Sequence, residues 1–211
     1  MKDYFVPAEQ ARCEITVINS RFIASLSPAP TLEAARDFIA QIRREFADAS
    51  HNVPAYLVGG GATVTAYCSD DGEPSGTAGR PILAVLNGSG FGDVALVVTR
   101  YFGGTKLGTG GLVRAYTEAA QAVLAIARRA RYIAGYTALL VLPYNGFERV
   151  RLLVLAHGGE ILEQDFAADV TLTLRFPLTG YEPFCAAVRD LSAGAWQPEI
   201  METGEWLQAV D

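Results

Sequence analysis

The stretch DVALVVTRYFGGTKLGTGGLVRAYTEAAQAVLAIARRAR, residues 93–131, decides the fold of the first part of this chain. Residues 93–101 form a nearly continuous apolar run, which predicts a strand that is buried on both faces. Residues 102–111 are rich in glycine and predict a flexible loop. From residue 112 apolar side chains recur every three or four positions, which predicts a long helix to about residue 131. The last turn of that helix would hold three arginines that complement the helix dipole: Arg128, Arg129 and Arg131.

The residues before this stretch predict further strands and two helices. Residues 12–26 alternate loosely between apolar and polar side chains, which predicts a strand or a hairpin. Pro30 and Thr31 mark the start of a helix over residues 31–46, where apolar positions have helical spacing. Short apolar runs on either side of Gly59-Gly60-Gly61 predict a second hairpin. Turn formers then predict a loop over residues 69–81 and leave a short helix over residues 82–86.

The chain after Gly135 restarts with strand and helix patterns in the order βαββαβ. This order is that of the ferredoxin-like sandwich, an antiparallel sheet with two helices on one face. The expected fold class is therefore α+β, with one domain over residues 1–133 and a ferredoxin-like domain over residues 134–211. In the second domain we expect strands at residues 136–142, 160–166, 169–176 and 196–203, and helices at residues 146–157 and 181–193.

Charge is unevenly distributed along the 211 residues, whose formal net charge is -6. Residues 1–135 carry a net charge of +1 and residues 136–211 carry -7. The acidic half would repel a polyanion, so any contact with nucleic acid is expected in the first half. The sequence has neither the ~20 consecutive apolar residues of a membrane span nor a secretion signal, which predicts a cytoplasmic protein without membrane contact. Its three cysteines and two histidines are too scattered along the sequence for a metal site built on cysteine or histidine ligands.

The glycine-rich loop is the first candidate for chemistry. Gly110 and Gly111 precede the predicted helix, where free backbone N–H groups and the positive dipole end favour an anion. Lys106 would add charge, and a basic rim would be completed by Arg80, Arg100 and Arg114. The spacing matches neither the Walker loop nor the dinucleotide fingerprint. The alternative is a tight turn from strand to helix that binds nothing.

The acidic loop is the second candidate, because it places Asp70, Asp71 and Glu73 within four residues. Such carboxylates bind a divalent cation in some loops and only shape the turn in others. We expect turn formers here and predict no metal. His51 is a candidate general base or phosphate donor, with a packing role as the alternative.

Several of these segments together resemble the signature of the IMPACT/YigZ family. They are Ser69-Asp-Asp-Gly-Glu-Pro-Ser-Gly-Thr-Ala-Gly-Arg-Pro81, Arg100-Tyr-Phe-Gly-Gly104, Leu107-Gly-Thr-Gly-Gly-Leu-Val-Arg-Ala-Tyr116 and His51-Asn-Val-Pro-Ala-Tyr56. The resemblance implies an N-terminal domain of the ribosomal-protein-type βαβ fold and a C-terminal ferredoxin-like domain. The eukaryotic relatives regulate translation, so the resemblance also implies a link to translation.

We therefore predict a translation-associated binding protein that contacts RNA or ribosome-linked partners through a glycine-rich groove of its N-terminal domain. The alternative is an enzyme that acts on a small phosphorylated or anionic ligand in the same groove. No motif marks a nucleophile, which favours binding over catalysis, whereas the mixed acidic and glycine-rich loops favour a small anionic ligand over a wide RNA surface. No cofactor is expected, and the oligomeric state is left open. The groove would be lined by His51, Asp70, Asp71, Glu73, Arg80, Arg100, Gly103, Gly104, Lys106, Gly108, Gly110, Gly111 and Arg114.

Overall fold

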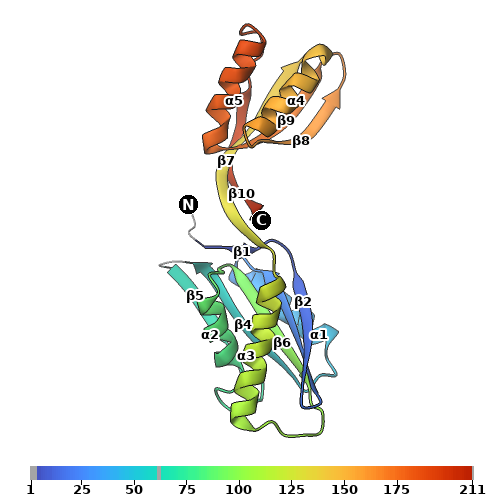
Figure 1. Ribbon diagram of the computed structural model, residues 1–211, viewed down its shortest axis with the longest axis vertical. Helices are drawn as coiled ribbons and strands as arrows, with labels where there is room; N and C mark the ends of the chain where they lie inside the picture. Colours follow the sequence, from blue (N-terminus) through green and yellow to red (C-terminus); the bar gives the residue numbers. More distant parts are fainter. Residues whose placement is uncertain (1–3, 61–62, 211) are drawn as a thin grey trace. The chain divides into compact units, whose positions relative to one another are not determined.

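The computed structural model describes residues 4–60 and 63–210 and shows an α+β protein (Figure 1). The chain divides into two compact units, one formed mainly by the residues up to Arg131 and the other by Tyr132–Leu207. Each unit has its own hydrophobic core. None of the helices within the described ranges is long and apolar enough to cross a membrane.

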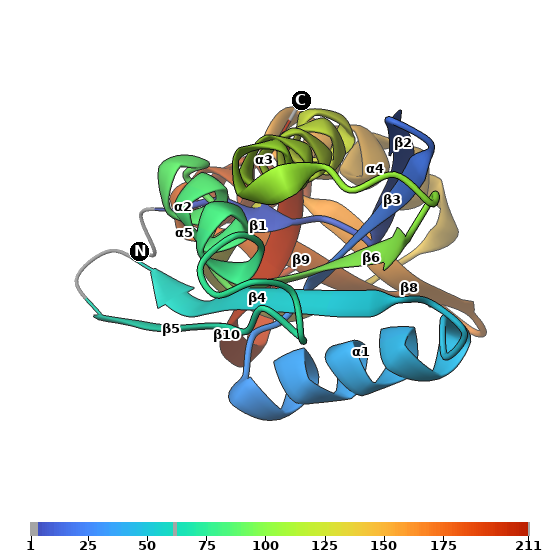
Figure 2. The ribbon, with the colours of Figure 1, turned by 90° about the horizontal axis from the view of Figure 1, so that it is seen from below.

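The N-terminal unit is built on a five-stranded sheet in the order β2-β3-β6-β4-β5, with every neighbouring pair antiparallel. The central strand β6 is buried from Val94 to Arg100, because helices cover both faces of the sheet. Figure 2 shows α1 on one face and α2 with α3 on the other. The elements are β1 (Val6–Pro7), β2 (Ala11–Val17), β3 (Ser20–Pro28), α1 (Leu32–Glu45), β4 (His51–Gly60), β5 (Thr63–Cys68), α2 (Gly79–Gly88), β6 (Val94–Tyr101) and α3 (Gly108–Ile126).

Local sequence explains why the first three elements form where they do. Ile18 and Asn19 connect β2 to β3 with positive φ angles of 44° and 65°, as a tight two-residue hairpin turn requires. Thr31 then caps α1 by accepting a hydrogen bond from the N–H of Ala34 at 3.1 Å. The predicted hairpin over residues 12–26 and the predicted helix over residues 31–46 are both confirmed.

Three boundaries differ from the prediction. His51 starts β4, so that strand begins earlier than the predicted run 55–58. Helix α2 begins at Gly79, which shortens the predicted loop to residues 69–78; Pro81 is tolerated because first-turn N–H groups have no helical acceptor. Helix α3 begins at Gly108, so the last glycines of the predicted loop are helical. Part of the turn of the second predicted hairpin, residues 61–62, lies outside the described residues.

The arginines predicted for the last helical turn lie elsewhere. Helix α3 ends at Ile126, and β7 begins at Arg129. The guanidinium groups of Arg129 and Arg131 lie 5.0 and 4.3 Å from the ring centroid of Phe5. Contact with this ring, together with the pairing of β1 with the start of β7, replaces the predicted contact with the helix dipole.

The C-terminal unit has the predicted order βαββαβ. Strand β7 lies between β9 and β10, and β8 pairs with the outer side of β9. This order, with the first strand between the third and the fourth, is the ferredoxin-like arrangement. The strand predicted to begin at residue 136 begins at Arg129 instead. The elements are β7 (Arg129–Leu142), the short 3-10 helix η1 (Tyr144–Gly146), α4 (Phe147–Ala156), β8 (Glu160–Phe166), β9 (Val170–Pro177), α5 (Leu178–Leu191) and β10 (Glu199–Val210).

Candidate functional site

A buried ion pair lies where the central strand of the N-terminal unit ends. Arg100, near the end of β6, donates from Nη1 to Oε1 of Glu73 at 2.6 Å, and the two side chains are only 7% and 3% exposed. Glu73 comes from the loop over residues 69–78. Removing two charges from water is costly unless they pair closely and satisfy their remaining polar atoms. The other contacts of Glu73 and Arg100 therefore determine whether an atom of the pair is left to bind a ligand.

Tyr116 of α3 provides one of those contacts. Its O–H donates to the same Oε1 of Glu73 at 2.8 Å, and its ring packs edge-on against Phe22 at 5.2 Å. Burial raises the pKa of Tyr116 far above its usual range, and the charge of Glu73 raises it further. Tyr116 is therefore a permanent hydrogen-bond donor to Glu73 under physiological conditions.

The guanidinium of Arg100 is held in place yet not fully hydrogen-bonded. Its carbon lies 5.5 Å from the ring centroid of Phe22 and 5.6 Å from that of Phe102. Nη2 donates weakly to Oγ of Ser20 at 3.4 Å. Nε is the single buried side-chain nitrogen or oxygen without a hydrogen-bond partner among residues 4–60 and 63–210. A buried donor without an acceptor costs ~1–3 kcal/mol, so an oxygen atom beside Nε would be stabilised.

His51 lies beside this pair because strand register places it there. His51 and Phe22 are the cross-strand partners of Arg100 on β4 and β3. Nδ1 of His51 lies 2.7 Å from the carbonyl oxygen of Asp71. A carbonyl only accepts, so this hydrogen bond places the ring proton on Nδ1. Nε2 then lies 3.9 Å from Oε2 of Glu73, with a free lone pair while the ring is neutral.

Asp70 shapes the loop rather than lining a site. Its carboxylate accepts hydrogen bonds from the backbone N–H groups of Gly76, Ala78 and Gly79, and so caps the start of α2. Burial acts to raise the pKa of Asp70, but these three N–H donors outweigh it and lower the pKa.

Asp71 also has structural partners. Its Oδ1 accepts from Arg43 at 2.7 Å, and its Oδ2 accepts from the backbone N–H of Asn52 at 2.7 Å. Its backbone φ of 48° lies in the left-handed region, which aspartate tolerates. Within the part of the chain that the structure describes, no three His, Cys, Asp or Glu side chains are grouped to hold a metal ion.

A cavity of about 540 Å³ opens over the ion pair. At its rim, Lys106 precedes the first turn of α3, where Leu107 supplies no side-chain cap for the N–H groups. These uncapped donors and the ammonium give this side of the cavity a positive character. The lining consists of Ser50, His51, Glu73, Pro74, Arg100, Phe102, Lys106, Leu107, Gly108, Thr109 and Leu112.

Five of the predicted groove residues line this cavity: His51, Glu73, Arg100, Lys106 and Gly108. The others do not. Asp70 caps α2 and Asp71 pairs with Arg43, whereas Arg80 and Arg114 are exposed on α2 and α3. Gly103 packs against the backbone of Asn19 and donates its N–H to Ser20. Exposed Gly104 has a φ of 85°, and Gly110 and Gly111 belong to the first turn of α3.

Sequence reasoning missed Tyr116, Ser20, Phe22 and Phe102 as parts of this site. Tyr116 follows the apolar spacing that predicts the long helix from residue 112, and it lies in the core under that helix. A buried phenol needs a hydrogen-bond partner, which is a signal that points to a polar group beneath that face. No comparable signal marks the other three, because strand register and loop folding bring them to Arg100.

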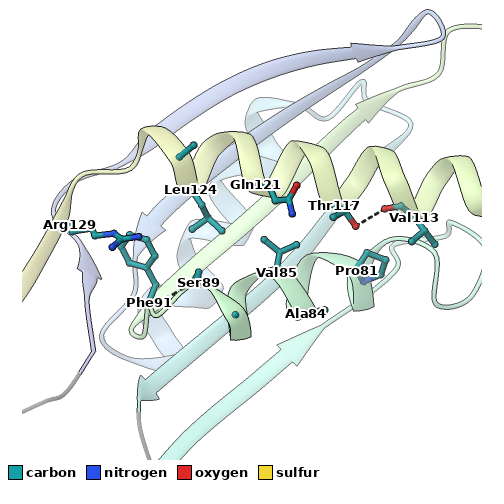
Figure 3. A pocket seen from close by; sticks show the side chains of 12 residues that line it. Pro81, Ala84, Val85, Ser89, Phe91, Val113, Thr117, Gln121, Leu124 and Arg129 are labelled. Atoms are coloured by element: carbon teal, nitrogen blue, oxygen red, sulfur yellow. Dashed lines mark hydrogen bonds between the residues drawn. The ribbon is translucent and has the colours of Figure 1, made fainter.

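A larger cavity of about 730 Å³ lies between α2 and α3, and its lining includes neither the Glu73–Arg100 pair nor His51. Figure 3 shows Val85 and Pro81 of α2 facing Leu124 and Val113 of α3 across it. Its lining includes a single charged side chain, Arg129, and none of the predicted groove residues. Size alone therefore does not identify the candidate site, whereas the buried charges do.

Fold and site together define a two-unit α+β protein with an arginine-centred cavity at the end of its central strand. Residues 18–124 match the Impact N-terminal domain, and residues 140–195 match a domain of unknown function, DUF1949. The chain is 36% identical over 206 residues to an IMPACT family member of Haemophilus influenzae, with 97% of this chain and 100% of the relative covered. It therefore belongs to the IMPACT family.

Two further comparisons give a second relative and a solved structure of similar fold. IMPACT family member YigZ of Escherichia coli is 36% identical over 200 residues, with 93% of this chain and 97% of the relative covered. A crystal structure of a protein described as hypothetical is 35% identical, with a TM-score of 0.62 and coverage of 96% of this chain and 98% of that one.

Proposed function

We propose that this chain is a translation-associated binding protein whose N-terminal unit holds an anionic group in the Arg100 cavity. The anion would be a phosphate of RNA or of a ribosome-linked partner. The observation that carries the proposal is that Arg100 lines the cavity with its Nη1 fixed by Glu73 and its Nε without a hydrogen-bond acceptor. The chain belongs to the IMPACT family, and the link to translation is what its resemblance to the eukaryotic relatives implies.

Three groups at the cavity favour an anion. Arg100 is held by Glu73 and by two aromatic rings, so little conformational entropy is lost when it binds. Lys106 and the uncapped first turn of α3 add positive charge that Glu73 does not neutralise. Only a few phosphates would be contacted, so binding to RNA should be weak. The slope of log K against log salt should have a magnitude of about 2–4, at ~0.7–0.9 per phosphate.

A second candidate function is an enzyme that acts on a small phosphorylated or anionic ligand. Two observations favour it. The cavity volume of about 540 Å³ lies within the ~300–1,000 Å³ of small-molecule sites. His51 keeps a free lone pair on Nε2 beside the cavity, which is the arrangement of a general base.

Charge reversal at the rim tests the proposal without disturbing the buried pair. Lys106→Glu should weaken the binding of a fluorescent RNA oligomer about 5- to 10-fold in anisotropy titrations at low salt, because an exposed charge contact contributes ~1 kcal/mol. Arg114→Glu is the matched control, since Arg114 is exposed on α3 and does not line the cavity. Its RNA affinity should stay within about twofold of wild type.

Two outcomes would contradict the proposal. Equal losses in both variants would show a diffuse electrostatic surface rather than a site. Absence of RNA binding, together with a rise in Tm on addition of a phosphorylated metabolite, would favour the second candidate function.

A further inference from the structure

A second cavity, of about 460 Å³, lies on the other face of the N-terminal sheet. The residues of the Arg100 cavity belong to the face under α2 and α3, whereas this cavity lies beside α1, which Figure 2 shows alone on its face. No residue lines both cavities. The lining of the second cavity consists of Arg36, Ile39, Ala40 and Arg43 of α1, Pro54 and Tyr56 of β4, and Tyr67 of β5.

Two stacked tyrosines form one wall. Tyr56 and Tyr67 are direct cross-strand partners, and their rings stack at 5.2 Å with an interplanar angle of 22°. Tyr56 is 6% exposed and is part of the core under α1, so it fixes the position of its neighbour. Tyr67 is 45% exposed, although it lies in a cavity wall. The sheet therefore holds a rigid aromatic ring at the surface, which suits stacking with a flat aromatic ligand.

Two arginines form the facing wall. Arg36 and Arg43 are seven residues apart on α1, or ~10 Å along the axis, with Ile39 and Ala40 between them. Arg43 pairs with Asp71 at 2.7 Å, which orients it. The side chain of Arg36 has no hydrogen bond or ion pair with any residue in the ranges 4–60 and 63–210. No carboxylate lines the cavity, so its charge is positive.

We propose that this second cavity binds a nucleobase together with an attached phosphate. The base stacks on Tyr67, and the phosphate lies against Arg36. An aromatic ring on which a base stacks, beside positive charge for the phosphate, is the combination with which proteins bind single-stranded nucleic acid. No Asn, Gln, Asp or Glu lines the cavity to read the edge of adenine or cytosine, so side-chain hydrogen bonds of that kind do not select between these two bases. The source of this base and phosphate is an unpaired RNA segment or a free nucleotide.

Single substitutions measure separately what the Tyr67 ring and the Arg36 charge contribute to binding. Binding of a fluorescent oligouridylate by the full chain is measured by anisotropy. Tyr67→Ala should weaken it about 5- to 150-fold, the range of base–aromatic stacking, whereas Tyr67→Phe should keep it within about twofold. Arg36→Ala should weaken binding and reduce the salt slope by about 1. Arg44→Ala is the matched control, because Arg44 is exposed on α1 outside the cavity. Circular dichroism melting verifies that each variant is folded.

Competition identifies the source of the ligand. AMP that displaces the oligomer at low concentration shows a free-nucleotide site, and displacement by unlabelled oligomer alone shows an RNA site. Ribose 5-phosphate lacks the base and should compete far more weakly than AMP; equal competition would overturn the proposal. So would unchanged binding in folded Tyr67→Ala. Lys106→Glu tests the Arg100 cavity separately, so a loss in Tyr67→Ala without a loss in Lys106→Glu supports this site and contradicts the other.

Discussion

Glu73 and Arg100 form an ion pair in which Nη1 lies 2.6 Å from Oε1 and neither side chain is more than 7% exposed. Because the pair is buried, its two members depend on each other for stability. Removing one partner of a buried pair leaves an uncompensated charge in a low-dielectric environment, which is far more costly than losing a pair at the surface.

Glu73→Gln should therefore lower the free energy of unfolding by about 3–5 kcal/mol, measured by urea denaturation. The amide still accepts a hydrogen bond from Tyr116 but no longer balances the charge of Arg100. Glu14→Gln is the control, since Glu14 pairs with Arg21 at 2.9 Å at an exposed position and should change stability far less. Equal effects of the two substitutions would show that burial of the Glu73 pair does not matter.

Tyr116→Phe should remove one charged hydrogen bond and cost about 1.5–3 kcal/mol at neutral pH. The raised pKa of Tyr116 predicts the pH dependence of this loss. The folded state keeps the phenol proton at a pH where the unfolded state loses it, so the contribution is complete below about pH 10 and declines as the pH rises. The free energy of unfolding should thus fall less steeply above pH 10 in Tyr116→Phe than in wild type. A parallel decline in both proteins would contradict the prediction.

Asp70→Asn should reveal the opposite pH dependence. The pKa of Asp70 is lowered in the folded state, so its carboxylate stabilises the protein above about pH 4 and loses this effect as the pH falls further. Wild type should therefore lose more stability than Asp70→Asn between pH 5 and pH 2, followed by thermal melting. Asp70→Ala removes the cap of α2 as well and should cost ~0.5–2 kcal/mol at neutral pH. Identical acid titrations of wild type and Asp70→Asn would exclude this role.

A fragment of residues 134–211 should fold without the rest of the chain. The C-terminal unit has its own core, which includes Leu140, Val154, Leu172 and Phe184. Units of this size are marginally stable, so a low Tm is expected. A well-dispersed NMR spectrum would support the domain boundary proposed from the sequence. A poorly dispersed spectrum, typical of a disordered chain, under native conditions would contradict it.

The fold was predictable where the sequence pattern is local. The apolar run of β6, the capped helix α1 and the order βαββαβ all follow from periodicity and capping within one segment. The start of α3 at Gly108 was not predictable in this way. Glycine is a poor helix former, but α3 nevertheless begins with three glycines among its first four residues. The positions of Arg129 and Arg131 depend on Phe5, which is more than 120 residues away in the sequence.

In the candidate site, too, local sequence predicts some features and contacts between distant residues determine the others. Local motifs indicated Arg100, Glu73 and His51, because charged residues beside turn formers stand out in a sequence. The partners that fix them are distant: Tyr116 is 43 residues from Glu73, and Ser20 is 80 residues from Arg100. Arg80 and Arg114 were predicted to complete a basic rim of the groove, but they are exposed on α2 and α3 and do not line the cavity. Contacts of this kind depend on tertiary packing and not on local pattern.

The Arg100 cavity forms only when three strands pair in the correct register. Phe22, Arg100 and His51 meet only because β3, β6 and β4 pair in one alignment. A slip of one residue in β6 would turn Arg100 toward α1 and away from Glu73, since alternate side chains point to opposite faces of a sheet. A misaligned sheet would thus present a different surface to any partner. A partner that binds this cavity as proposed would therefore bind only a chain whose central strands are correctly paired.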